Sequence, residues 1–167
     1  MPRMILVSGC SAVGKTTLAK RLASRLELRY LSADNFYEVI NGDERLHENK
    51  FDVWMALYRA LHIAEQQGID CIVDANTLTT VDRDQFLGWF PGFEHHLIYI
   101  HADPELRKRN NMMRSRQVPD AAMDRMTRIV QEPSSESLDS RWKSYVRVNN
   151  VNNDFLIAEL EGDAFYA

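Results

Sequence analysis

The sequence predicts an α/β fold in which a parallel β-sheet lies between two layers of helices. Two observations support this prediction. Short apolar runs typical of strands alternate along the 167 residues with longer segments of helical periodicity, and this alternation is typical of parallel sheets covered on both faces. A glycine-containing segment also joins the first strand-like run to the first helical segment. The sequence has no apolar run of about 18 residues, the length that would span a bilayer.

Five strand-like runs define the expected sheet. They are short and apolar, and they cover residues 4–8, 30–32, 69–73, 97–101 and, less clearly, 145–148.

Helical segments fill the intervals between these runs. Residues 53–64 carry apolar side chains at helical spacing, and Gly68 is suited to end that helix. Asp103 followed by Pro104 predicts the start of another helix, because Asp is a frequent N-cap and Pro fits the first helical position. Residues 118–120 restart a helix after a break.

Composition indicates one ordinary globular domain, covering residues 1–167. Hydrophobic residues make up 45% and charged residues 26% of the chain. The net charge of −4 argues against a long nucleic-acid groove, because proteins that grip long nucleic acids usually present a broad basic surface. Cys10 and Cys71 are too few for a disulfide framework or a zinc site, so we expect reduced thiols and a cytoplasmic location, with no membrane partner.

Residues 9–16 read Gly-Cys-Ser-Ala-Val-Gly-Lys-Thr, which matches the phosphate-binding loop pattern GxxxxGK[ST]. Its glycines allow backbone N–H groups to turn around a phosphate, and the following helix directs its positive dipole end at the same anion. Lys15 is predicted to reach the β- and γ-phosphates of ATP and Thr16 to bind Mg²⁺. The predicted nucleotide-binding residues of this segment are Gly9, Ser11, Ala12, Val13, Gly14, Lys15, Thr16 and Thr17.

Asp34 follows the second strand-like run and is a candidate general base. In an open α/β sheet, ligands bind beyond the carboxyl ends of the strands, so Asp34 is expected to face the same crevice as the phosphate loop. A carboxylate there would accept the proton of an attacking hydroxyl. The alternative is that Asp34 only caps the next helix.

Asp74 ends the third strand-like run and is a candidate for the magnesium site. An apolar strand that closes on a carboxylate is the form expected for the residue that orients Mg²⁺ or its waters beside the phosphates. The alternative is that Asp74 caps a turn.

Residues 107–116 read RKRNNMMRSR and hold five cations in an otherwise acidic protein. This cluster predicts a helical lid over about residues 104–120 that closes on the phosphates, neutralises charge and excludes water. Arg109 is a candidate for stacking on the base, and Arg114 and Arg116 for contacting the transferred phosphoryl group. The sequence leaves open whether Arg114 or Arg116 makes this contact. The alternative to a lid is a basic helix face exposed to solvent.

Taken together, these motifs resemble those of the P-loop kinases of the AAA and zeta-toxin-like group, and in particular the kinase domain of the phage 5′-hydroxyl polynucleotide kinases. The resemblance covers about residues 4–126. Its motifs are GCSAVGKT, Ser32-Ala33-Asp34 followed by an aromatic residue, Asp74-Ala75-Asn76-Thr77-Leu78, and Lys108-Arg109-Asn110 leading to Val118-Pro119.

The resemblance implies an adenylate-kinase-like core with a five-stranded parallel sheet and an arginine-bearing lid. It also implies transfer of the γ-phosphoryl group of ATP to a hydroxyl, with Asp34 as the base. The phage enzymes place an arginine three residues after the base, where this chain has Tyr37. The acceptor is therefore left open between a 5′-hydroxyl of a nucleic acid or nucleotide and the hydroxyl of a metabolite, sugar or antibiotic. A nucleotide-dependent ATPase or switch without transfer is a third interpretation.

Overall fold

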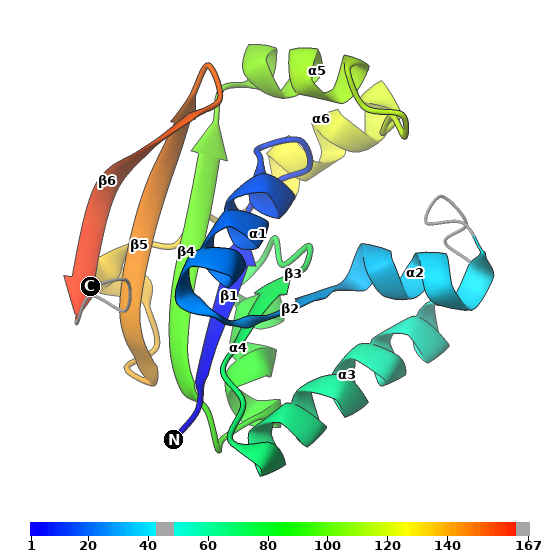
Figure 1. Ribbon diagram of the computed structural model, residues 1–167. Coiled ribbons are helices and arrows are strands. Elements are labelled where there is room, and N and C mark those ends of the chain that lie inside the picture. The colour runs from blue at the N-terminus through cyan, green and yellow to red at the C-terminus, as the bar shows by residue number, and fades with distance from the viewer. Residues whose placement is uncertain (43–48, 163–167) are drawn as a thin grey trace.

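The computed structural model describes residues 1–42 and 49–162, and the predicted domain of residues 1–167 also covers segments that lie outside this range. Six strands form a single sheet in the order β2-β3-β1-β4-β5-β6 (Figure 1). The strands are β1 (Arg3–Ser8), β2 (Arg29–Ser32), β3 (Cys71–Asp74), β4 (Glu94–Ala102), β5 (Trp142–Val151) and β6 (Asp154–Gly162).

Six α-helices and one short 3₁₀ helix surround the sheet in the described part of the chain. None of the described helices is both long enough and apolar enough to span a bilayer. The helices are α1 (Lys15–Leu26), α2 (Ala33–Asn41), α3 (Lys50–Gln67), α4 (Thr80–Trp89), α5 (Pro104–Met112), α6 (Asp120–Ile129) and η1 (Ser135–Ser137).

Strand β1 lies in the middle of the sheet, and both of its faces are buried. It pairs in parallel with β3 on one side and β4 on the other. Met4 and Leu6 pack into the core that α3 and α4 cover, whereas Ile5 and Val7 pack into the core that α1 covers. All four side chains are fully buried, as expected for a parallel strand between two helical layers. The predicted three-layer α/β fold is confirmed.

The prediction of five strands is wrong by one, because β6 adds a sixth. β6 runs antiparallel to β5 and follows a tight turn in which Asn152 and Asn153 have φ values of 52° and 69°. Asparagine tolerates this left-handed conformation and is frequent in two-residue hairpin turns. A shift in register between Arg147 and Val148 bulges β6, so Ile157 and Leu160, three residues apart, lie opposite Val148 and Val146. The bulge breaks the simple alternation that would have marked β6 as a strand.

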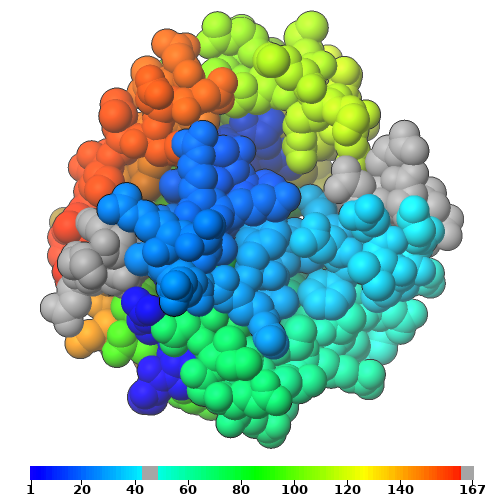
Figure 2. Space-filling model, viewed as in Figure 1, coloured from blue at the N-terminus to red at the C-terminus, as the bar shows by residue number. Residues whose placement is uncertain are grey.

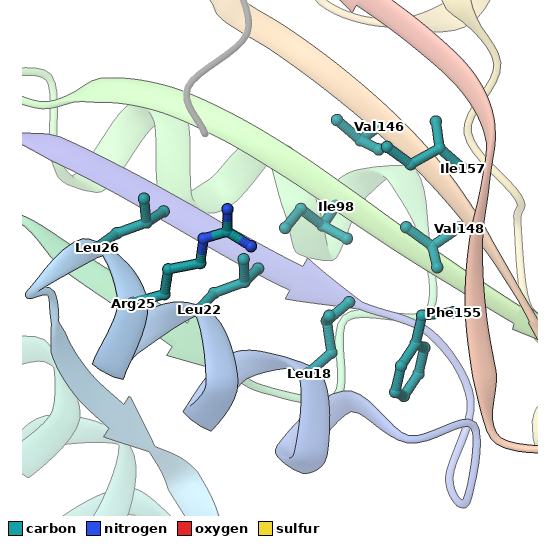
Figure 3. Close-up of a pocket in the computed structure, with 9 residues that line it drawn as sticks. All are labelled: Leu18, Leu22, Arg25, Leu26, Ile98, Val146, Val148, Phe155 and Ile157. Carbon is teal, nitrogen blue, oxygen red and sulfur yellow. The ribbon is translucent and has the colours of Figure 1, made fainter. Parts of the chain in front are cut away.

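The face of the sheet beside α1 is only partly covered. Side chains from α1, β4, β5 and β6 line a groove of about 240 Å³. Figure 3 shows Leu22 on α1 and Ile157 on β6 at opposite sides of this groove. Phe155, at the start of β6, closes the end of this groove nearest the phosphate loop. The start of β6 therefore lies beside the phosphate loop.

Both cysteines are buried free thiols, as predicted. Gly68 has a φ of 68° and ends α3, and α5 begins at Pro104 after Asp103. These helix boundaries agree with the sequence patterns. The reason is that caps depend on a few neighbouring residues rather than on distant contacts.

Candidate active site

The phosphate loop connects β1 to α1 and contains two glycines that no other residue could replace without strain. Gly9 has a φ of 146°, and a Cβ there would lie 2.6 Å from the Ile100 carbonyl oxygen. Gly14 has a φ of 100°, and its Cβ would lie 2.8 Å from the ring of Phe155. In the space-filling view the dark-blue atoms of this part of the chain are recessed below the yellow-green segment that carries α5 (Figure 2).

Lys15 is the first residue of α1, and its side chain lies inside the curve of the loop. Its Nζ donates to the carbonyl oxygens of Gly9 at 3.0 Å and Cys10 at 2.8 Å. Burial lowers the pKa of this ammonium, and the carboxylates of Asp74 and Asp34 oppose that change. A desolvated cation is thus held among backbone groups at the end of the sheet where anions bind.

Thr16 and Asp74 form a cluster of oxygen donors beside Lys15. The Thr16 hydroxyl donates to Asp74 Oδ2 at 2.7 Å, and the Tyr30 hydroxyl donates to the same oxygen at 3.0 Å. Burial and the neighbouring Asp74 raise the pKa of Tyr30, so Tyr30 stays a hydrogen-bond donor. The N-cap of the next helix, α4, is Thr79. Tyr30 was not among the predicted site residues, since nothing local to it indicates a contact with Asp74.

Asp34 lies in the first turn of α2 and is partly exposed, with Ser32 in the N-cap position. Asp34 is therefore not the N-cap of α2. Asp34 Oδ1 lies 3.5 Å from Nη1 of Arg116. Tyr37, on the next turn, is buried, and its pKa is raised by burial and by Asp34. The position where the phage enzymes have an arginine is thus occupied here by a buried aromatic side chain.

The cationic segment folds as α5, a short loop and α6, at the same end of the sheet as the phosphate loop (Figure 1). The loop ends are held together by Asn111, whose side chain accepts from the Val118 N–H at 2.8 Å and donates to the Val118 carbonyl at 2.7 Å. This pair encloses the stretch that carries Arg114 and Arg116. Arg116 reaches Asp34, and the charge of Arg114 lowers the pKa of Lys15.

The other predicted residues occupy different positions around the loop. Arg109 is exposed on α5 and donates to Asn152 Oδ1 at 3.2 Å, which places it beside the β5–β6 turn. Thr17 is exposed in the first turn of α1. Ala12 adopts a left-handed backbone with a φ of 64°. Ser11 and Val13 are buried, and their carbonyls are hydrogen-bonded by distant side chains described below.

Arg107 does not belong with the exposed cations of this segment. It is buried, and its Nε donates to the Ser11 carbonyl at 3.2 Å while Nη1 donates to the Thr127 hydroxyl at 2.7 Å. Sequence reasoning counted Arg107 as part of the lid charge. The helical position of Arg107 next to the apolar Leu106 was the available signal that this side chain faces inward.

A family model described as an AAA domain (AAA_33) matches residues 4–133 of this chain. The chain belongs to the AAA domain family. The match begins at β1, contains the phosphate loop, Asp34, Asp74 and the cationic segment, and ends before β5. The hairpin of β5 and β6 lies beyond the part that the family model describes. A search of curated proteins finds no match to this chain.

Solved structures show the same fold as this AAA domain. A putative kinase from Chloroflexus aurantiacus aligns with a TM-score of 0.70 at 23% identity, covering 89% of this chain and 88% of that one. A sugar kinase from Janibacter sp. aligns at 0.66 and 17% identity, covering 89% and 86%. A chain of the Pnkp1/Rnl/Hen1 RNA repair complex aligns at 0.69 and 15% identity, covering 83% of this chain and 46% of that one.

Proposed function

We propose that this protein is an ATP-dependent kinase that transfers the γ-phosphoryl group to an acceptor hydroxyl. One arrangement carries the proposal. Lys15 donates to the Gly9 and Cys10 carbonyls inside the loop, the adjacent Thr16 contacts Asp74, and Arg116 contacts Asp34. A phosphate cradle, a metal-type carboxylate, a candidate base and a candidate lid cation therefore lie at the same edge of the sheet, beyond the ends of β1, β2 and β3. Phosphoryl transfer needs this combination, because its catalysis is mainly positioning and electrostatic stabilisation.

In this proposal the loop amides and Lys15 bind the phosphates of ATP. Lys15 exchanges its contacts with the Gly9 and Cys10 carbonyls for contacts with phosphate oxygens, so the ammonium loses no hydrogen bonds on binding. Arg109 lies beside the β5–β6 turn and is assigned to stack on the nucleobase of ATP. The full set of proposed nucleotide-binding residues is Gly9, Ser11, Ala12, Val13, Gly14, Lys15, Thr16, Thr17 and Arg109.

The oxygen donors of Thr16 and Asp74 fit Mg²⁺. Both are hard oxygen ligands, and their oxygens lie 2.7 Å apart, between the start of α1 and the end of β3. A magnesium ion bound through one hydroxyl and one carboxylate would take its other ligands from phosphates and water, as is usual for this ion. When bound, the ion would neutralise charge on the phosphates, and Tyr30 would hold Asp74 in place.

Asp34 is assigned as the general base, and Arg116 is assigned as the cation that contacts the transferred phosphoryl group. The acceptor hydroxyl gives its proton to the Asp34 carboxylate while its oxygen bonds to the γ-phosphorus and the bond to ADP breaks. Arg116 already reaches Asp34 from the lid loop. A guanidinium at this position would stabilise negative charge on the transferred group.

Two acceptor classes follow from the same site. The first is a 5′-hydroxyl of a short nucleic-acid end or nucleotide, and the second is a metabolite, sugar or antibiotic hydroxyl. The net charge of −4 and the buried Tyr37 both favour a small acceptor over a long polynucleotide. A non-transferring ATPase is the alternative from another class.

The test is a labelling panel. The protein is incubated with γ-labelled ATP, Mg²⁺ and separate sets of 5′-hydroxyl oligonucleotides, nucleosides and sugars, and the labelled products are separated. Label on one acceptor class supports the kinase and identifies that class. Label released only as inorganic phosphate would overturn the kinase proposal in favour of the ATPase.

A further inference from the structure

The carbonyls of the phosphate loop are held from outside by three side chains that are distant in sequence. The Ser11 carbonyl accepts from Arg107 Nε at 3.2 Å and the Ala12 carbonyl from Asn110 Nδ2 at 3.2 Å, both on α5. The Val13 carbonyl accepts from Asn150 Nδ2 at 2.8 Å, across a sequence separation of 137 residues. Three consecutive peptide groups thus have their oxygens turned away from the inside of the loop.

The orientation of these carbonyls fixes the orientation of the next N–H groups. The described chain has no cis peptide bond, and in a trans peptide the C=O and the following N–H point in opposite directions. An outward carbonyl of Val13 therefore directs the N–H of Gly14 inward. Gly14 has the freedom to lose this arrangement, because glycine accepts many backbone conformations.

We propose that Asn150 is a positioning residue of the nucleotide site, which keeps the Val13–Gly14 peptide in the phosphate-binding orientation. This inference rests on the proposed function. Asn150 is on β5, outside the matched AAA segment, and only 4% of its surface is exposed. Its NH₂ group must face Val13, because a flipped amide would place one oxygen against another.

The side-chain carbonyl oxygen of Asn150 indicates that a contribution to folding stability alone does not explain this residue. Among the described residues, the buried Oδ1 of Asn150 has no hydrogen-bond partner. An unpaired buried carbonyl costs free energy. An apolar side chain of the same shape would remove the unpaired Oδ1 of Asn150 but leave the Val13 carbonyl unpaired in its place, so the two penalties oppose each other. The net effect on unfolding is expected to be small, whereas the effect on the loop is direct.

The hairpin supports the same peptide from a second side. Phe155, opposite Asn150 in the β5–β6 pairing, has its ring against Gly14. The Asn153 side chain accepts from Asn110 at 3.0 Å, which ties the hairpin turn to the residue that holds the Ala12 carbonyl. The sixth strand thus contributes to the geometry of the phosphate loop.

The first test compares Asn150→Leu with a matched control, Asn149→Leu. Asn149 is the preceding residue on β5, faces the opposite side of the sheet, and also has a buried Oδ1 without a partner among the described residues. The affinity for a fluorescent ADP analogue and the Tm are measured for both variants. We expect about tenfold weaker binding for Asn150→Leu with a Tm close to that of Asn149→Leu, and near wild-type binding for Asn149→Leu.

Asn150→Asp provides a second measurement with a signature that a purely structural role would not produce. Its ionised carboxylate cannot donate to the Val13 carbonyl and adds negative charge near the phosphates. Protonation restores a donor and removes the charge, so binding by Asn150→Asp should recover toward wild type as the pH falls. The ratio of its affinity to that of the wild type at the same pH is the quantity to compare.

The outcomes separate this inference from the proposed function. If the wild type binds the ADP analogue and Asn150→Leu binds equally well, the positioning role is overturned and the kinase proposal stands. A parallel loss of binding and Tm in both leucine variants, or a pH-independent defect in Asn150→Asp, also overturns it. If the wild type binds no nucleotide, both proposals fall together.

Discussion

Nη1 of Arg116 lies 3.5 Å from Oδ1 of Asp34, so an arginine of the loop between α5 and α6 contacts the carboxylate at the start of α2 across 82 residues of sequence. Asp34 is half-exposed, whereas the Arg116 side chain is mostly buried. The pair brings together the candidate base and the candidate phosphoryl-binding cation.

Asp34→Asn should abolish phosphoryl transfer and leave nucleotide binding nearly intact. The amide keeps the size of the side chain but cannot take the proton of the acceptor, so kcat should fall by about 10²- to 10⁴-fold. Steady-state kinetics and ADP-analogue binding measure the two effects. Glu38→Gln is the matched control, because Glu38 is exposed one turn later on the same helix. Full activity of Asp34→Asn would remove Asp34 from the mechanism.

Arg116→Gln should lower kcat more than it raises the KM for ATP. The reason is that a cation aimed at the moving phosphoryl group stabilises the transition state more than the ground state, and we expect a loss of about 100-fold in kcat. Arg114→Gln, measured in parallel, shows how the two lid arginines share this role. Arg125→Gln on the exposed face of α6 serves as the control. An effect confined to KM would instead assign Arg116 to ordinary binding.

Asp74→Asn should raise the Mg²⁺ concentration needed for half-maximal activity by about 10- to 100-fold, because the amide is a weaker magnesium ligand than the carboxylate. Tyr30→Phe removes only the hydrogen bond to Asp74 Oδ2 and should raise this concentration by a smaller factor. Magnesium titrations of activity test both variants. An unchanged magnesium requirement in Asp74→Asn would contradict the assignment.

Lys15→Met should weaken ATP binding without lowering the Tm. Lys15 is buried, and burial lowers its pKa, so the charged group is held at a cost in folding free energy. An apolar side chain of similar length removes that cost but also removes the contact with phosphate, for a loss of roughly 10- to 100-fold in affinity. Thermal unfolding with and without ATP checks both parts. A variant that melts earlier and still binds ATP would contradict this picture.

The stability of the wild type should fall as the pH decreases from about 6.5 to 4, partly because of His95. Burial lowers the pKa of His95 from 6.5 to about 4, so in this range the unfolded chain binds a proton that the folded chain does not. The loss amounts to about 1.4 kcal/mol per pH unit and on the order of 3 kcal/mol over the interval. Well above pH 6.5 the residue is neutral in both states and contributes no pH dependence.

His95→Asn isolates this contribution. Asparagine does not titrate, and its amide can keep a hydrogen bond to the backbone of Phe86, which His95 makes in the wild type. The difference in unfolding free energy between pH 7.5 and pH 5, measured by urea denaturation, should be smaller for the variant than for the wild type. Equal differences would show that His95 does not carry this pH dependence.

Local patterns predicted the five parallel strands, the end of α3 and the start of α5, but they did not predict β6. Parallel strands buried on both faces are continuous apolar runs, and β1 shows this clearly. β6 lies at the sheet edge, is largely exposed and contains a bulge, so its apolar residues follow no simple period. The Asn152-Asn153 turn was the one local signal of a hairpin.

The phosphate loop and the carboxylates that follow the strands could be predicted from the sequence alone. The loop is eight consecutive residues whose glycines and lysine carry their own conformational and chemical requirements, and the ends of parallel strands meet at one edge of a sheet. Only the tertiary structure decided which donors hold the loop carbonyls and that Tyr30 supports Asp74. Arg107, Asn110 and Asn150 reach the loop across 96 to 137 residues. Such contacts depend on how the elements pack, and no local pattern encodes that packing.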